Sequence, residues 1–157
     1  MTTYTDIQYL HTHDAVESTT TSTIPVKTTE LSGVVPGRRY WVLARCSISS
    51  DNTSFGQGGA AVELWDATNN QQMVGSYGLR HPYSASYFQQ WSYSVVFTAG
   101  SEDVGGGGRL YTKLSVETSG DTVQQDDTTI TAIDITDLVE GRDYFYAENT
   151  TAANNST

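Results

Sequence analysis

The alternation of apolar and polar positions is clearest at residues 39–49, directly after the sequence Val34-Val35-Pro36-Gly37. Pro36 fits the second position of a turn and Gly37 accepts a positive φ, so we predict a turn there. One side of the stretch that follows is wholly apolar and consists of Tyr40, Val42, Ala44, Cys46 and Ile48. The other side begins with Trp41 and Leu43 and then becomes polar. This pattern predicts a central strand of a β-sandwich, with one face in the core and the other covered at one end only.

Similar patterns recur along the chain between segments rich in Gly, Ser, Asn and Asp. They predict strands within residues 1–10 and at 24–26, 60–65, 72–77, 87–97, 110–117 and 130–138, followed by a last aromatic segment at 143–147. Residues 17–23 fit either a strand or a solvated edge. The pattern predicts loops or turns at 51–59, 78–85, 101–108 and 119–127. About eight strands without an amphipathic helix predict an all-β chain, an antiparallel jelly-roll-like β-sandwich.

The predicted strand at 87–97 carries the strongest aromatic signal. Tyr87, Trp91, Tyr93 and Phe97 fall on one side of it, together with Val95. Because an aromatic side chain buries about 150–250 Å², this strand is expected to supply much of the core.

Two short internal similarities bear on domain organisation. The order Asp6-x-x-Tyr9 before a Ser/Thr-rich run returns as Asp143-x-x-Tyr146, and residues 31–40 are similar to residues 135–144. We therefore predict that residues 1–140 form one sandwich domain. Residues 141–157 are then the start of a second module, or an arm that adds a strand to a neighbouring copy.

Composition and charge narrow the classes of function. Of 157 residues, 37% are hydrophobic and 17% are charged, whereas about a quarter are charged in ordinary soluble domains. The 8 basic and 18 acidic residues give a formal net charge of −10, which argues against nucleic acid or an anionic membrane as a partner. The first residues lack the pattern of a signal peptide, which predicts synthesis in a host cytoplasm. The single cysteine, Cys46, is expected to be a small buried apolar side chain.

The order of strand types resembles a known family. A Thr-rich lead-in at 18–23 precedes LSGVVPGRRYWVLA at 31–44, VELWD at 62–66, a Tyr-rich strand, LSVE at 114–117 and TITAIDI at 129–135. This run is similar to the jelly-roll modules of tailed-bacteriophage virion proteins. The resemblance implies a structural protein of the virion, a capsid decoration (cement) or head-fibre subunit. Its implied partners are the phage major capsid protein or another virion protein, and copies of itself in a homo-oligomer, expected to be a homotrimer.

Residues with the chemistry of catalysis are sparse, and we predict no enzyme, no catalytic residue and no resident metal or cofactor. The chain has no Gly-x-Ser-x-Gly elbow, and its adjacent carboxylates would point to opposite faces of a strand. His11 and His13 would share a strand face beside Asp14, which could hold a metal only between symmetry-related copies. The oxygen-rich residues 51–54, Asp121, Asp126 and Asp127 leave Ca²⁺ as an alternative to solvated turns.

Aromatic residues around the predicted loop at 78–85 supply the candidate interface or ligand-binding positions. They are Tyr77, His81, Tyr83 and Tyr87, near Trp91, and the tail adds Tyr144, Phe145 and Tyr146. Exposed aromatic side chains can anchor a protein partner or stack on sugars. They therefore also support an alternative function, a receptor- or carbohydrate-binding module of a tail fibre or adhesin.

Overall fold

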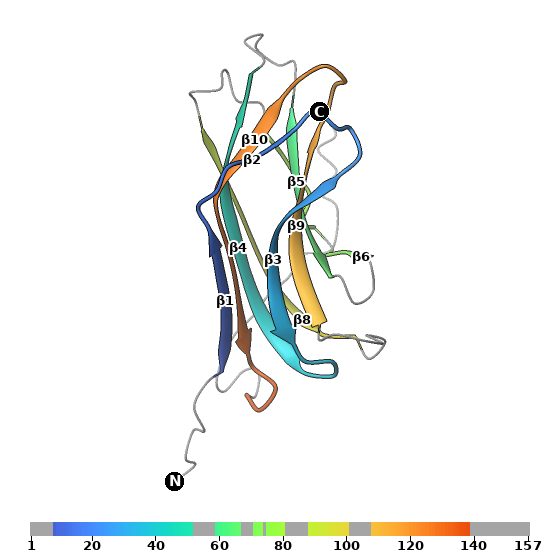
Figure 1. The fold of residues 1–157 in the computed structure, drawn as a ribbon. Helices are drawn as coiled ribbons and strands as arrows, with labels where there is room; N and C mark the ends of the chain where they lie inside the picture. Colours follow the sequence, from blue (N-terminus) through green and yellow to red (C-terminus); the bar gives the residue numbers. More distant parts are fainter. Residues whose placement is uncertain are drawn as a thin grey trace, which may run out of the picture.

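The computed structural model describes residues 8–51, 59–66, 71–73, 75–80, 88–100 and 108–138. These residues form two antiparallel sheets that face each other (Figure 1). The first, sheet A, has the order β1 (Tyr9–Asp14), β10 (Val123–Asp134), β4 (Arg39–Ser50) and β8 (Gln89–Thr98), and β2 (Ser18–Thr20) also pairs with β10. The second, sheet B, has the order β3 (Val26–Val34), β9 (Gly108–Val116), β5 (Ala60–Asp66) and β6 (Gln71–Gln72), and β7 (Gly78–Arg80) also pairs with β5.

The strand order is that of a jelly roll. From β3 to β5 and again from β8 to β10, each strand lies in the opposite sheet from the strand before it. The short β2 continues along the flank of β10 that β1 occupies, and β6 and β7 share one flank of β5, so each sheet has four strand positions. The predicted all-β antiparallel sandwich of about eight strands is confirmed. Within the described residues, no helix is long and apolar enough to cross a bilayer.

The apolar side of β4 lies in the core, as its alternation predicts. Val42 and Ile48 are completely buried, and they pack in one cluster with side chains from both sheets, including Leu64, Leu114 and Ile130. Cys46 is buried as expected. The turn before β4 is also as predicted, since Gly37 has a φ of +82°.

Several stretches differ from the sequence-based prediction. Residues 75–77, predicted as strand, lie outside β6, and β10 ends at Asp134 and not at residue 138. Residues 123–127 were expected in a turn, but they form the first part of β10. Gly78–Arg80 is a short strand and not the start of a loop, and β3 extends through Val34 beyond the edge strand expected at 24–26. The strand signal was weak at 123–127 because β10 has a register irregularity between Asp126 and Thr129, which interrupts the alternation of faces.

A polar cluster between the sheets accounts for the unusual start of β10. Gln125 is 1% exposed, and its Nε2 donates to Thr112 Oγ1 at 3.1 Å and to Thr128 Oγ1 at 2.7 Å. Its Oε1 accepts a hydrogen bond from Thr28 Oγ1 at 3.0 Å. Because Thr28 and Thr112 lie in sheet B, the amide of Gln125 joins the two sheets through satisfied hydrogen bonds.

Candidate functional site

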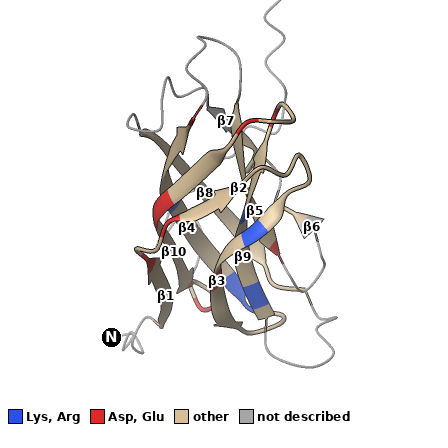
Figure 2. Cartoon of the chain, turned by 45° about the horizontal axis from the view of Figure 1, so that its top comes forward, with Lys and Arg blue, Asp and Glu red and all other residues tan. Residues whose placement is uncertain are grey.

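The outer face of sheet B is covered by side chains that satisfy one another. Lys113 Nζ lies 3.3 Å from the centroid of the Trp65 ring, and Trp65 Nε1 donates to Glu63 Oε2 at 2.6 Å. Glu30 forms ion pairs with Lys27 and, at 3.5 Å, with Arg109. Figure 2 shows these basic positions on β3 and β9. A face whose charges and rings are already paired offers little free energy to a partner.

The pairing of Glu30 predicts a small acid dependence of stability. The hydrogen bond from Lys27 lowers the pKa of Glu30 below 4.5, against a smaller opposing effect of burial. The resulting stabilisation is present above the unfolded-state pKa and is lost as pH falls through the lowered folded-state pKa. We expect Glu30→Gln to cost about 0.5 kcal/mol of unfolding free energy near neutral pH, because the pair is partly exposed. Urea denaturation of both proteins should show this difference vanish near about pH 2, and a difference that persists there would contradict the assignment.

The outer face of sheet A exposes apolar side chains at one end. The strand register places Tyr9, Ile133, Trp41 and Val96 side by side across β1, β10, β4 and β8, and we call this set the apolar row. Tyr9 is 69% exposed and Trp41 is 37% exposed. Leu43, in the next row, is 39% exposed. Trp41 Nε1 donates to Ser94 Oγ at 2.8 Å, which holds the indole towards β8.

The middle of the same face is hollowed into a groove of about 660 Å³. Its lining includes Leu43, Arg45 and the hydroxyl side chains of Ser92, Ser94, Thr129 and Thr131, with His11 at β1. The groove therefore begins where the apolar row ends. Hydroxyl, imidazole and guanidinium side chains line it, but most of its lining area is apolar.

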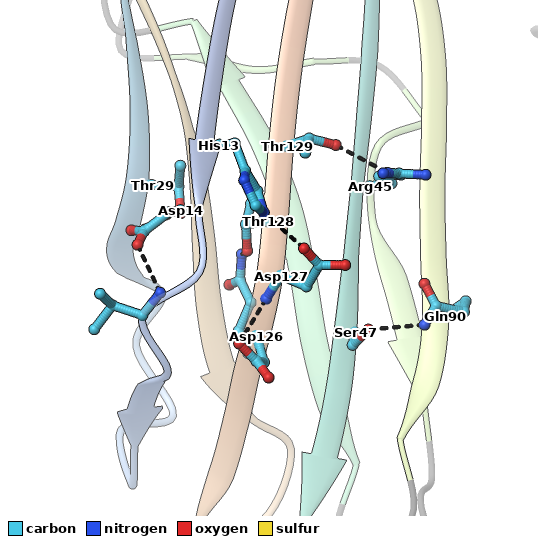
Figure 3. A network of polar contacts seen from close by, with 12 residues as sticks. His13, Asp14, Thr29, Arg45, Ser47, Gln90, Asp126, Asp127, Thr128 and Thr129 are labelled. Atoms are coloured by element: carbon cyan, nitrogen blue, oxygen red, sulfur yellow. Dashed lines mark hydrogen bonds and ion pairs between the residues drawn. The ribbon is translucent and has the colours of Figure 1, made fainter.

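At the end of the groove away from the apolar row, the face carries a polar network at the irregularity of β10 (Figure 3). His13 Nε2 lies 2.7 Å from Asp127 Oδ1, and Arg45 Nε donates to Thr129 Oγ1 at 3.1 Å. Asp127 has a φ of +49°, a left-handed conformation that is uncommon for a residue other than glycine. The backbone N–H of Asp127 donates to Asp126 Oδ1 at 2.7 Å, which helps to hold this conformation.

The histidines lie on one face of β1, as the spacing predicts, but Asp14 points the other way. Asp14 Oδ2 accepts a hydrogen bond from Thr29 Oγ1 of β3 at 3.4 Å, so its carboxylate is turned from the two imidazoles. His11 Nδ1 contacts Thr131 Oγ1 at 2.9 Å. In the part of the chain that the structure describes, no three His, Cys, Asp or Glu side chains are grouped as a metal site requires.

The carboxylates considered for Ca²⁺ have separate roles. Asp51 Oδ1 accepts a hydrogen bond from the Thr122 N–H at 2.7 Å, and Asp126 and Asp127 belong to the network at the irregularity of β10. Asp51 thus joins the end of β4 to the segment before β10. Residues 52–54 lie outside the described residues.

Of the seven candidate positions, the structure describes one. Tyr77 is 54% exposed next to β7, and burial of part of its side chain raises the pKa of its hydroxyl, with Glu117 and Glu63 adding to the rise. Trp91, which the aromatic cluster was expected to include, is 2% exposed and belongs to the core. The other six candidate positions lie outside the described residues: His81, Tyr83, Tyr87, Tyr144, Phe145 and Tyr146.

The apolar row and Arg45 were not among the candidate positions. The one sequence signal for them is the side of residues 39–49 that begins apolar with Trp41 and Leu43. The contributions of Tyr9, Ile133 and Val96 depend on the strand register, and residues so distant in sequence give no local signal of adjacency.

No protein-family model matches the chain, and no curated protein matches it. Among solved structures, the chain is similar to the Eiger TNF of S. frugiperda, with a TM-score of 0.51 and 10% identity over 88% of this chain and 99% of that one. Lower TM-scores relate it to the Stig cyclase Fisc from Fischerella sp. TAU (0.40, 21% identity, 66% of this chain) and to infectious bursal disease virus Gt strain (0.45, 8% identity, 82% of this chain). The aligned parts span 54% of the cyclase chain and 31% of the virus chain. The similarity to the TNF structure shows a shared jelly-roll β-sandwich fold and no more than the fold.

Proposed function

We propose that this chain is a non-enzymatic structural subunit of a bacteriophage particle, a capsid decoration (cement) or head-fibre protein. It binds the major capsid protein or another virion protein, and copies of itself, through the outer face of sheet A. The observation that carries the proposal is the contrast between the two outer faces. On sheet B, the charged and aromatic side chains described above are paired with one another, whereas sheet A exposes Tyr9, Trp41 and Leu43 at one end of its outer face.

The physical basis is the burial of apolar and aromatic area. Burial contributes about 25 cal/mol per Å², and aromatic anchors near the centre of an interface dominate its energy. The order of the strand types along the sequence, which resembles phage virion modules, supports placement in a virion. The net charge of −10 suits a position on the outside of a capsid, away from packaged DNA.

We expect the double substitution Tyr9→Ser/Leu43→Ser to weaken binding to assembled capsids about 100-fold, because two exposed anchors are lost. Cosedimentation of the protein with assembled capsids lacking it measures the loss. Tyr77→Ser is the matched control, since it removes an exposed tyrosine elsewhere and should leave capsid binding unchanged. Failure of the unaltered protein to cosediment would exclude the cement role, and equal losses for both variants would exclude sheet A as the binding face.

A receptor- or carbohydrate-binding module is the second candidate, and the exposure of Tyr77 is the observation in its favour. In that case Tyr77→Ser would abolish binding on a glycan array, while Tyr9→Ser/Leu43→Ser would not. Because Trp91 is buried, it cannot contribute to an aromatic surface for sugars near Tyr77.

A further inference from the structure

Arg45 is a cation without a counter-charge at the centre of the outer face of sheet A. Its Nε donates to Thr129 Oγ1, and no carboxylate of the described residues lies within 4.0 Å of its guanidinium. Lys27, Arg38 and Arg109 differ, because each has a carboxylate within that distance. Figure 3 shows Arg45 extending from β4 towards β8, on the side away from Asp127. The guanidinium thus lines the groove with its terminal nitrogens available to an incoming acceptor.

Asp127 is the complementary group on the same face. The bulge places it on the outside of β10, with its side chain 59% exposed. His13 engages its Oδ1, and Oδ2 makes no hydrogen bond with any described residue. Its position is about one row of residues, or ~7 Å along the strands, beyond the row of Arg45.

Along the strands, the face runs from apolar through basic to acidic. The apolar row comes first, then Arg45 with His13, then Asp126 and Asp127. Copies related by an axis parallel to the strands meet row to row, so that apolar side chains cover apolar side chains. A two-fold axis in the plane of the face and perpendicular to the strands would instead place the apolar row against carboxylates, which costs desolvation without a compensating contact.

We propose that the outer face of sheet A binds a second copy of this chain with the strands of both copies in the same direction, and that Arg45 of one copy pairs with Asp127 of the other. The inference deepens the proposed function, on which it rests, by naming the polar contact of self-association. Two molecules that each carry a formal charge of −10 repel one another, so a face that joins them needs opposite charges within reach of one another. Arginine also forms the two-pronged hydrogen bonds that a carboxylate accepts, and it is enriched at interface anchors.

A double-mutant cycle on the self-association constant tests the pair, with Arg45→Gln, Asp127→Asn and the double variant measured by analytical ultracentrifugation. Asparagine keeps an oxygen for His13 and tolerates the left-handed backbone of Asp127. Each single variant is expected to associate about 10-fold more weakly, and the double variant no more weakly than the weaker single. Arg109→Gln on sheet B, which also removes one positive charge, should leave association unchanged.

Each contrary result has a distinct meaning. Additive losses, or no loss in the single variants, would overturn the Arg45–Asp127 pair, even where Tyr9→Ser/Leu43→Ser abolishes self-association and so supports the face. A chain that stays monomeric at all concentrations would overturn the inference as a whole. The double-mutant cycle and the self-association measurement are independent of the capsid-binding experiment, which can fail separately. Equal melting temperatures of the variants and the unaltered chain establish that any loss comes from the interface.

Discussion

Gly78→Ala is expected to lower the free energy of unfolding by about 3 kcal/mol, because one added methyl group would overlap the core. A Cβ at Gly78 would lie 2.1 Å from Trp91 Cδ1 and 2.2 Å from its Nε1. Trp91 is 2% exposed and stacks with Tyr93 at a centroid distance of 6.3 Å, so its ring has little room to move. The glycine of β7 in sheet B is therefore the space into which the indole of β8 in sheet A fits. Urea denaturation measures the loss.

Two further variants separate overlap from backbone effects. Gly75→Ala places a methyl group with no neighbour within 4 Å, at a φ of +74°, so we expect only the conformational cost of about 1–2 kcal/mol. In a Trp91→Leu background, Gly78→Ala should cost far less than it does alone, because the indole that it would overlap is absent. An undiminished cost in that background would show that the overlap is not the cause.

The core strands could be predicted from the sequence because their signals are local. Residues 39–49 alternate without interruption, and the structure buries the predicted side of β4, including Val42 and Ile48. The aromatic side of β8 is likewise buried at Trp91 and Val95. Period-two alternation reports which side of a strand is covered, and in both strands the buried apolar residues fall on the predicted side, although Tyr93 and Phe97 of β8 are only partly buried.

The start of β10 and the strand β7 could not be predicted, for a physical reason in each case. In β10, the inward position at 125 is held by a glutamine, and the bulge after Asp126 shifts the faces by one residue. In β7, Gly78 is a poor strand former whose presence is explained only by the indole across the sandwich. Both depend on contacts between sheets, which a single strand's pattern does not contain.

Only part of the candidate interaction face could be predicted from the sequence. The apolar start on the outer side of residues 39–49 predicted that this end is covered, but the structure leaves Trp41 and Leu43 exposed there. Which residues stand beside them follows from pairing with β1, β10 and β8, which no local pattern fixes. The aromatic residues around residue 83 give a local sequence signal, but one of them, Trp91, belongs to the core.

Gln125→Met is expected to lower the free energy of unfolding by about 2–3 kcal/mol, although methionine is similar in size and more apolar. The change removes the amide that donates to Thr112 and Thr128 and accepts from Thr28, all between the sheets. Their hydroxyls then lose a partner where water has little access, since Thr112 is 0% exposed and Thr128 is 2% exposed. Chemical denaturation measures the change, and Gln90→Met at the exposed surface of β8 is the control, with a shift within about 0.5 kcal/mol.

The loss of stability is expected to come from the threonine hydroxyls left without a hydrogen-bond partner, and not from the absence of glutamine itself. Adding Thr128→Val to Gln125→Met removes one unsatisfied hydroxyl, so the double variant should be no less stable than Gln125→Met alone. In the unaltered chain, Thr128→Val should be destabilising, because there it deprives the Gln125 amide of an acceptor. Equal costs of Thr128→Val in the two backgrounds would contradict a coupled network. A coupled network would mean that the hydrogen bonds of Gln125 hold the bulge of β10 in place. They would then also fix the outward position of Asp127 on the face of sheet A.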